Sequence, residues 1–159
     1  MRGLLCGAVG TAILAMGCGA DADGGEETCT VATDAGRIQA TIDGVDWAAE
    51  ATWTEAGDGV QVVSTTADGW RFTIAAQQAL ASVEVGDLPV VIDLSGDEGF
   101  VTAYPDSGAA SFSSSEGNGN LTLTARDGEA LSGCFSAELV SSDGDVLEVG
   151  DGEFVASAL

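Results

Sequence analysis

The sequence predicts an all-β fold: a single antiparallel sandwich or partly closed barrel of about nine or ten strands joined by hairpins. From residue 37 onward apolar and polar residues alternate at period two, which is typical of strands with one buried and one solvated face. Asp-Gly pairs separate the alternating runs, and this pair is the strongest short hairpin signal. No segment after the N-terminal region holds a helical apolar stripe over three turns.

The strands can be placed from their alternation and from the turns between them. The clearest alternating runs are 70–74, 88–94, 121–124 and 131–139. Residues 75–81 predict either one short turn of helix or a strand end. Serines at 111 and 113–115, followed by residues 117–120, predict a flexible polar loop. The expected turns are Asp43-Gly44, Asp58-Gly59, Asp68-Gly69, Asp127-Gly128 and Asp143-Gly144.

The N-terminus resembles the signal peptide of a bacterial lipoprotein. One basic residue, Arg2, precedes an apolar run over residues 4–16 and then Gly17-Cys18. The run is shorter than the roughly 20 residues of a transmembrane helix and matches a signal-peptide core of about 7–15. We expect residues 1–17 to be removed and Cys18 to be acylated, which places the protein in the cell envelope, at the outer membrane or cell surface. An ordinary secretory signal cut near Gly19-Ala20 is the alternative.

The cysteines predict how the mature chain is organised. Residues 18–36 are expected to form an acidic Gly/Ala-rich tether, and residues 37–159 the β-domain. Once Cys18 carries lipid, Cys29 and Cys134 remain, and an even remainder in an exported protein favours a disulfide. Two free thiols or a thiolate metal pair are the alternatives. Parity puts Cys134 on the solvated face of its strand, so the bridge should pin the N-terminal segment across the outside of the sheet.

The charge of the chain limits its partners. The formal net charge is −22, and Arg37, Arg71 and Arg126 are the cations left after the signal peptide. Phosphate backbones require Lys and Arg, so nucleic acid is excluded as a partner. The membrane is expected to be reached through the N-terminal lipid only. Self-repulsion favours a monomer, and a protein or glycan partner is left unidentified.

The residue types present exclude most catalytic chemistry. The chain has no histidine and no lysine, so Ser-His, Cys-His and Ser-Lys pairs cannot form. Carboxylate chemistry is left, but with 26 acids a suitable pair somewhere carries no information. We therefore expect a non-enzyme without a cofactor. Arg71 and Arg126 are expected in surface ion pairs.

The sequence contains two candidate binding sites, and each has an alternative explanation that requires no ligand. Asp143, Asp145, Asp151 and Glu153 flank the last hairpin and are candidate calcium ligands, although solvated turn acids explain them more simply. A second acidic loop lies at 95–98, and residues 21–24 copy the start of an EF-hand loop. Trp47, Trp53 and Trp70 could stack on sugars, but their parity assigns them to the core.

Four segments resemble those of a group of uncharacterised bacterial exported lipoproteins with an all-β domain. Residues 40–49 (ATIDGVDWAA) are similar to its opening motif A-x-I/V-D-G-x-x-W/F-x-A, and residues 121–124, 131–137 and 151–155 to its later strands. Cys134 stands where that group has Thr, as a disulfide variant would. The resemblance supports the predicted fold and the predicted localisation in the cell envelope, and it implies no activity.

These observations favour a lipid-anchored envelope protein that displays a non-catalytic β-domain with a binding or structural role. The alternatives are a carrier of a small apolar ligand, with a barrel cavity above about 300 Å³ lined by the tryptophans, and a carbohydrate- or calcium-binding module.

Overall fold

A computed structural model describes residues 29–57, 59–77, 89–95 and 97–159 of the 159-residue chain. The described residues form nine strands and no helix. Within them, no helical segment of the length and apolarity required to cross a bilayer is found. The strands are β1 (Arg37–Ile42), β2 (Val45–Ala56), β3 (Gly59–Ser64), β4 (Trp70–Ala76), β5 (Val90–Asp93), β6 (Gly99–Pro105), β7 (Phe112–Arg126), β8 (Ala130–Ser141) and β9 (Val146–Ala158).

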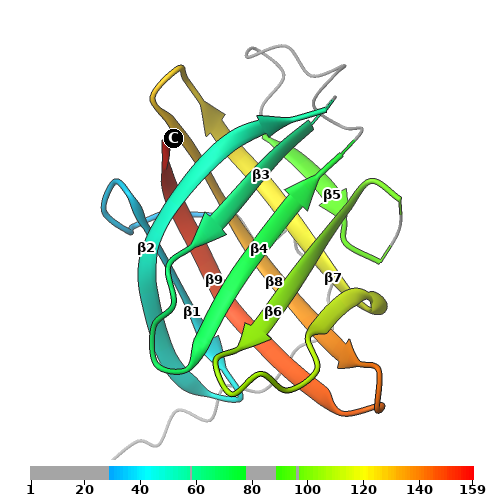
Figure 1. Cartoon of the computed structure of the whole chain (residues 1–159). Helices are drawn as coiled ribbons and strands as arrows, with labels where there is room; N and C mark the ends of the chain where they lie inside the picture. The colour runs from blue at the N-terminus through cyan, green and yellow to red at the C-terminus, as the bar shows by residue number, and fades with distance from the viewer. Residues whose placement is uncertain (1–28, 58, 78–88, 96) are drawn as a thin grey trace, which may run out of the picture.

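The strands form a closed barrel (Figure 1). Their order is β5-β7-β6-β4-β3-β2-β1-β9-β8, and β8 pairs back onto β7. Eight strands therefore close on themselves, while β5 adds to the edge of β7 that β6 leaves free. The pairings are antiparallel apart from a short parallel contact between β2 and β9. The predicted all-β fold is confirmed, in its barrel form.

Two of the predicted Asp-Gly hairpins have the expected geometry. Asp43 and Gly44 have φ of 49° and 76°, and Asp68 and Gly69 have φ of 45° and 82°. Both central residues are thus left-handed, as a type I′ turn requires. The turn at Asp127-Gly128 is held by a side chain instead, because Asp127 Oδ1 accepts hydrogen bonds from the backbone N–H groups of Glu129 and Ala130. Asp58 lies outside the described residues.

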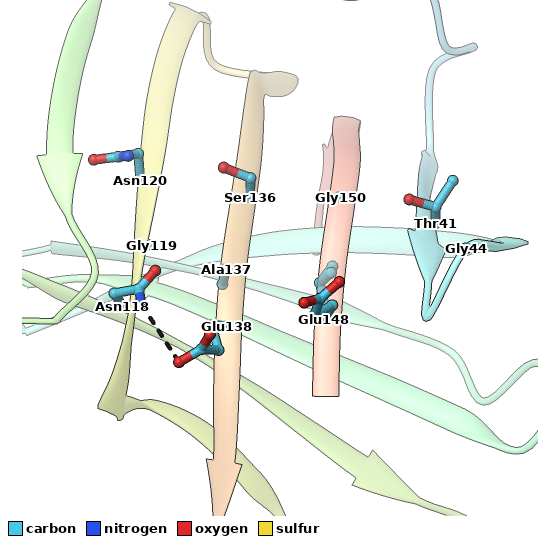
Figure 2. A pocket seen from close by; sticks show the side chains of 11 residues that line it. Thr41, Gly44, Asn118, Gly119, Asn120, Ser136, Ala137, Glu138, Glu148 and Gly150 are labelled. Carbon is cyan, nitrogen blue, oxygen red and sulfur yellow. Dashed lines mark hydrogen bonds between the residues drawn. The ribbon is translucent and has the colours of Figure 1, made fainter. Parts of the chain in front are cut away.

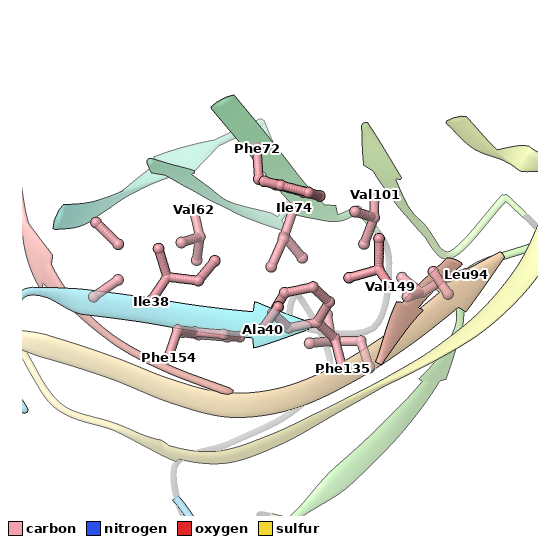
Figure 3. Close-up of a cluster of buried hydrophobic side chains, with 14 of the residues drawn as sticks. Ile38, Ala40, Val62, Phe72, Ile74, Leu94, Val101, Phe135, Val149 and Phe154 are labelled. Atoms are coloured by element: carbon pink, nitrogen blue, oxygen red, sulfur yellow. The ribbon is translucent and has the colours of Figure 1, made fainter. Parts of the chain in front are cut away.

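The barrel interior is filled by apolar side chains (Figure 3). In β8 residues 131, 133, 135, 137, 139 and 141 are buried and the alternate ones lie outward, so the predicted alternation is confirmed. Trp47 and Trp53 are core residues with 4% and 7% exposure, and half-buried Trp70 packs edge-on against Phe112. The largest fully buried side chains are Phe72, Phe154, Ile38, Ile74, Ile92, Leu94, Leu121, Leu123, Leu131, Leu139, Val62 and Val101.

Two reciprocal glycine–phenylalanine pairs pack the wall formed by β8 and β9. Gly133 lies opposite Phe154, and Phe135 lies opposite Gly152. A Cβ at Gly152 would come within 2.6 Å of the Phe135 ring, and one at Gly133 within 3.0 Å of the Phe154 ring. Each ring therefore occupies the space that a side chain on the facing residue would take. Both glycines are required by close approach, not by a left-handed backbone.

The N-terminal segment is fixed across the outside of the barrel. Cys29 and Cys134 form a disulfide with a Cα–Cα distance of 5.7 Å, as predicted. The Ala32 N–H donates to the Glu153 carboxylate at 2.8 Å, and the Gly36 N–H donates to the Val155 carbonyl at 2.6 Å. The last eight residues of the expected 18–36 tether are thus attached to β8 and β9. The signal peptide, Cys18 and residues 21–24 lie outside the described residues.

A single hydroxyl joins strands where the barrel closes. β6 and β7 pair at two positions, Thr102↔Ser113 and Ala103↔Phe112. Beyond them, fully buried Ser114 accepts a hydrogen bond from the Val101 N–H at 2.9 Å and donates to the Leu94 carbonyl at 2.7 Å. Ser114 therefore connects β6, β7 and the segment after β5 where backbone pairing ends.

Candidate ligand-binding groove

An open groove of about 440 Å³ crosses the outer wall of the barrel (Figure 2). It spans the neighbouring strands β7, β8, β9 and β1 and reaches the β1–β2 turn. Its walls carry amide, hydroxyl and carboxylate groups, and no tryptophan contributes to it. The lining residues are Thr41, Gly44, Asn118, Gly119, Asn120, Ser136, Ala137, Glu138, Glu148, Val149 and Gly150.

A β-bulge in β9 shapes the floor of this groove. Val149 pairs with Ala137 and Gly152 with Phe135, so Gly150 and Asp151 together lie opposite Ser136. Asp151, the second of these two residues, takes a left-handed conformation with φ of 47°. Gly150 has no side chain to fill the outer surface here, and a Cβ at this position would meet only the Thr41 hydroxyl, at 3.0 Å.

A larger irregularity in β7 supplies the opposite wall. The register against β8 shifts between Ser113 and Asn118. Gly117 crosses the neighbouring backbone so closely that a Cβ would lie 2.0 Å from the Glu138 carbonyl oxygen. The strand then continues with Asn118 and Asn120 exposed on the outer face. The prediction of a flexible polar loop was wrong for residues 113–115 and 117–120, because they are part of a 15-residue strand, and only Ser111 of the predicted loop lies before it.

Two carboxylates lie directly opposite each other within the groove. Glu138 of β8 pairs with Glu148 of β9, and both are exposed. The Asn118 side-chain amide donates to Glu138 at 3.5 Å (Figure 2). The Glu148 N–H donates to the Asp43 carboxylate at 3.0 Å, and the Asp43 N–H donates to the Glu148 carbonyl at 2.9 Å. These two bonds fix the β1–β2 turn as one end of the groove.

The four candidate calcium ligands occupy three different environments. Asp143 and Asp145 lie in the β8–β9 turn, where their N–H groups donate to the Ser141 hydroxyl at 3.3 and 3.1 Å. Asp151 is the bulge residue. Glu153 accepts hydrogen bonds from Ala32 and from the Gln39 amide, so its carboxylate holds the N-terminal segment. Within the described part of the chain, no three His, Cys, Asp or Glu side chains are placed to hold a metal ion.

Turn acids in this barrel stabilise their own turns. Hydrogen bonds from the Ser95 hydroxyl at 2.6 Å and the Ser95 N–H at 2.8 Å hold the pKa of Asp93 below its usual 3.8. The N–H groups of Glu129 and Ala130, at 2.8 and 2.6 Å, likewise lower the pKa of Asp127. These local bonds are what the interpretation of acidic loops as solvated Asx turns predicts.

The three arginines of the described residues lie away from the groove lining. Arg126 pairs with Glu55 at 2.5 Å, as expected, and its guanidinium lies 5.3 Å from the centre of the Trp53 ring. Arg71 instead stacks on Tyr104 at 4.7 Å, so the ion pair expected for it is replaced by a cation–π contact. Arg37 is exposed at the start of β1.

The chain was compared with family models, curated proteins and solved structures, and none of them matches it. Its function must therefore be argued from its own residues.

The sequence did not single out the groove, but it contains a signal for its floor. The buried positions of β9 are odd-numbered at Leu147 and Val149 and even-numbered at Phe154 and Ala156. Such a change of phase within one strand requires an extra residue, which is the bulge. The outward orientation of Thr41 and Ser136 can be predicted from the alternation of buried and outward residues in their own strands. Their proximity depends on the order in which the strands pair.

Proposed function

We propose that this chain is an exported, lipid-anchored binding protein whose barrel is non-catalytic and recognises a polar ligand or partner in its outer groove. The observation that carries the proposal is that the open space for a ligand lies on the outer wall of the barrel, not in its interior. The described core residues fill the barrel with apolar side chains, whereas the outer wall has an open polar groove of about 440 Å³. A rigid wall of paired strands that presents polar side chains is a suitable binding platform.

The proposed export and lipid anchoring are supported by two features. Gly17-Cys18 follows the short apolar run, and the Cys29–Cys134 disulfide is typical of oxidising, extracytoplasmic compartments. Changing Cys18→Ser should move the full-length protein from the detergent-rich to the aqueous phase in a Triton X-114 partition. Continued partition into the detergent-rich phase would contradict the anchor.

The non-catalytic role is supported by the surroundings of the groove acids. Glu138 and Glu148 are both exposed in an open, polar groove. Carboxylates that act as acid and base need environments that separate their pKa values, such as an apolar cleft around one of them. Neither groove carboxylate lies in an apolar cleft, because the groove that holds both is open and polar.

The binding role can be tested by filling the groove. Gly150→Val suits a strand and does not require a left-handed backbone, because the φ of Gly150 is not positive. The purified domain, residues 19–159, is incubated with insoluble cell-envelope material and sedimented. We expect the wild-type domain to co-sediment and Gly150→Val to stay in solution. Thr54→Ala, exposed on β2 outside the groove, is the matched control and should behave as wild type.

One observation favours a second candidate, the apolar-ligand carrier. The Trp53 indole N–H is buried and has no hydrogen-bond acceptor among the described residues. Buried donors usually have a partner, which a bound ligand could supply. If the barrel carries a fatty acid, oleate should change the tryptophan emission of the wild type and not that of Trp53→Phe. Identical responses of the two proteins would remove this candidate.

A further inference from the structure

Most of the polar groups in the groove are uncharged. Thr41 of β1, Asn118 and Asn120 of β7 and Ser136 of β8 contribute two hydroxyls and two carboxamides. The side chains of Thr41, Asn120 and Ser136 form no hydrogen bond with any other described residue, and that of Asn118 makes one long contact of 3.5 Å. The groove therefore presents donors and acceptors that the fold itself does not use.

These groups are arranged to meet an extended ligand. They come from paired strands, and neighbouring strands in a sheet lie about 4.8 Å apart. β9 passes between Ser136 and Thr41 and presents Gly150 instead of a side chain, so a ligand can approach the strand backbone (Figure 2). The geometry suits a chain-like ligand that crosses the strands and makes hydrogen bonds at several points.

The charge of the groove restricts the ligand further. Glu138 and Glu148 contribute carboxylate oxygens, and no arginine of the described residues lines the groove, so an anionic ligand would be repelled. A bare metal ion is not supported, because no group of three ligating side chains exists among the described residues. A simple organic cation would contact the two carboxylates and make no hydrogen bond with the amides and hydroxyls. A ligand rich in neutral hydroxyl groups uses all of them, since a hydroxyl both donates and accepts.

We infer that the groove binds a neutral oligosaccharide, or a neutral stretch of a longer polysaccharide, lying across β7, β8, β9 and β1. This inference rests on the proposed binding function of the groove and specifies its ligand class. No tryptophan lines the groove, so binding depends on hydrogen bonds without aromatic stacking. Affinity in the millimolar range follows for about four net hydrogen bonds of ordinary strength.

The test is an NMR titration of the ¹⁵N-labelled domain, residues 19–159, with five defined probes. The neutral probes are maltohexaose, cellohexaose and the hexamer of N-acetylglucosamine; the charged probes are hexagalacturonate and hexalysine. We expect at least one neutral hexamer to shift the Gly150 backbone amide and the side-chain amides of Asn118 and Asn120. Hexagalacturonate should leave these resonances unchanged.

Variants separate a specific groove from general surface binding. Asn120→Ala should weaken the affinity for the hexamer that binds about five-fold, as expected for one lost hydrogen bond. Gly150→Val should abolish the chemical-shift changes. Thr54→Ala should titrate as wild type. Amide dispersion of each variant in the absence of sugar shows whether its fold is intact; if Gly150→Val is not folded, Gly150→Ala, which adds one methyl group, replaces it.

The outcomes distinguish the ligand class from the function of the groove. If no neutral hexamer shifts the groove resonances, or if hexagalacturonate shifts them equally, the inference is overturned. If hexalysine alone shifts them, the ligand class is wrong while the groove remains a binding site for a basic partner. If the hexamer binds equally to wild type and to Gly150→Val, the location is wrong. Loss of envelope co-sedimentation in Gly150→Val, without any sugar response, would retain the proposed function and reject this ligand.

Discussion

Removing the Cys29–Cys134 disulfide is the perturbation whose effect the structure determines most directly. The bridge joins residues 105 positions apart. In the chain-entropy description, closing a loop of about 100 residues stabilises the fold by about 4.7 kcal/mol at 25 °C. The unfolding entropy of a domain of roughly 130 residues is about 0.27 kcal/mol/K. Replacing both cysteines by serine should therefore lower the melting temperature by about 17 °C.

The assay is a thermal melt of residues 19–159, followed by circular dichroism, for the wild type and for Cys29→Ser/Cys134→Ser. Reduced wild type should melt with the double variant, because both lack the same cross-link. Thr52→Ala, a half-buried outward residue of β2 with no side-chain hydrogen bond to a described residue, is the matched control and should change the unfolding free energy by less than about 0.5 kcal/mol. A loss below about 1 kcal/mol in the double variant would refute the reasoning.

Three further predictions concern the barrel itself. Ser114→Ala leaves two backbone groups of the closing seam without their buried partner, so urea denaturation should show a loss of about 2–3 kcal/mol. Gly152→Val drives a side chain into the Phe135 ring, and the variant should give poorly dispersed amide resonances at 25 °C. The folded-state pKa values of Asp93 and Asp127 are lowered, so the stability they contribute is present above the unfolded pKa near 3.8 and is lost as pH falls below it. Acid titration of Asp127→Asn should therefore show a shallower loss of stability below pH 3.8 than that of the wild type.

The strands and the disulfide could be predicted because each depends on a pattern that lies in one place in the sequence. Alternation at period two identifies β8 and its buried face, and the same parity places Cys134 outside. Asp-Gly pairs mark the turns after β1 and β3, where both residues take positive φ. Each of these inferences requires only a few neighbouring residues and the stereochemistry of the backbone.

The barrel closure and the groove could not be predicted, because they depend on which distant strands pair. β1 pairs with β9, so Thr41 lies beside Gly150, more than 100 residues away in the chain. Local alternation is the same in a sandwich and in a barrel, so it does not choose between them. The polar residues of β7 predict a loop because glycine and asparagine disfavour strands on average and serine favours turns. Pairing along β8 overrides that preference.

The attachment of the N-terminus and the groove lie on the same wall of the barrel, which has a consequence for the proposed lipid anchor. Cys134 and Ser136 are neighbouring outward residues of β8, about 7 Å apart along the strand. The chain enters this wall at Cys29, and the stretch from Cys18 to Cys29 can span at most about 40 Å when fully extended. An acylated Cys18 would therefore keep the groove within about that distance of the bilayer. The strongly negative chain would be repelled by anionic headgroups, so an anchored barrel would remain off the membrane surface, and a ligand of the groove would have to lie in the layer that residues 18–29 can reach.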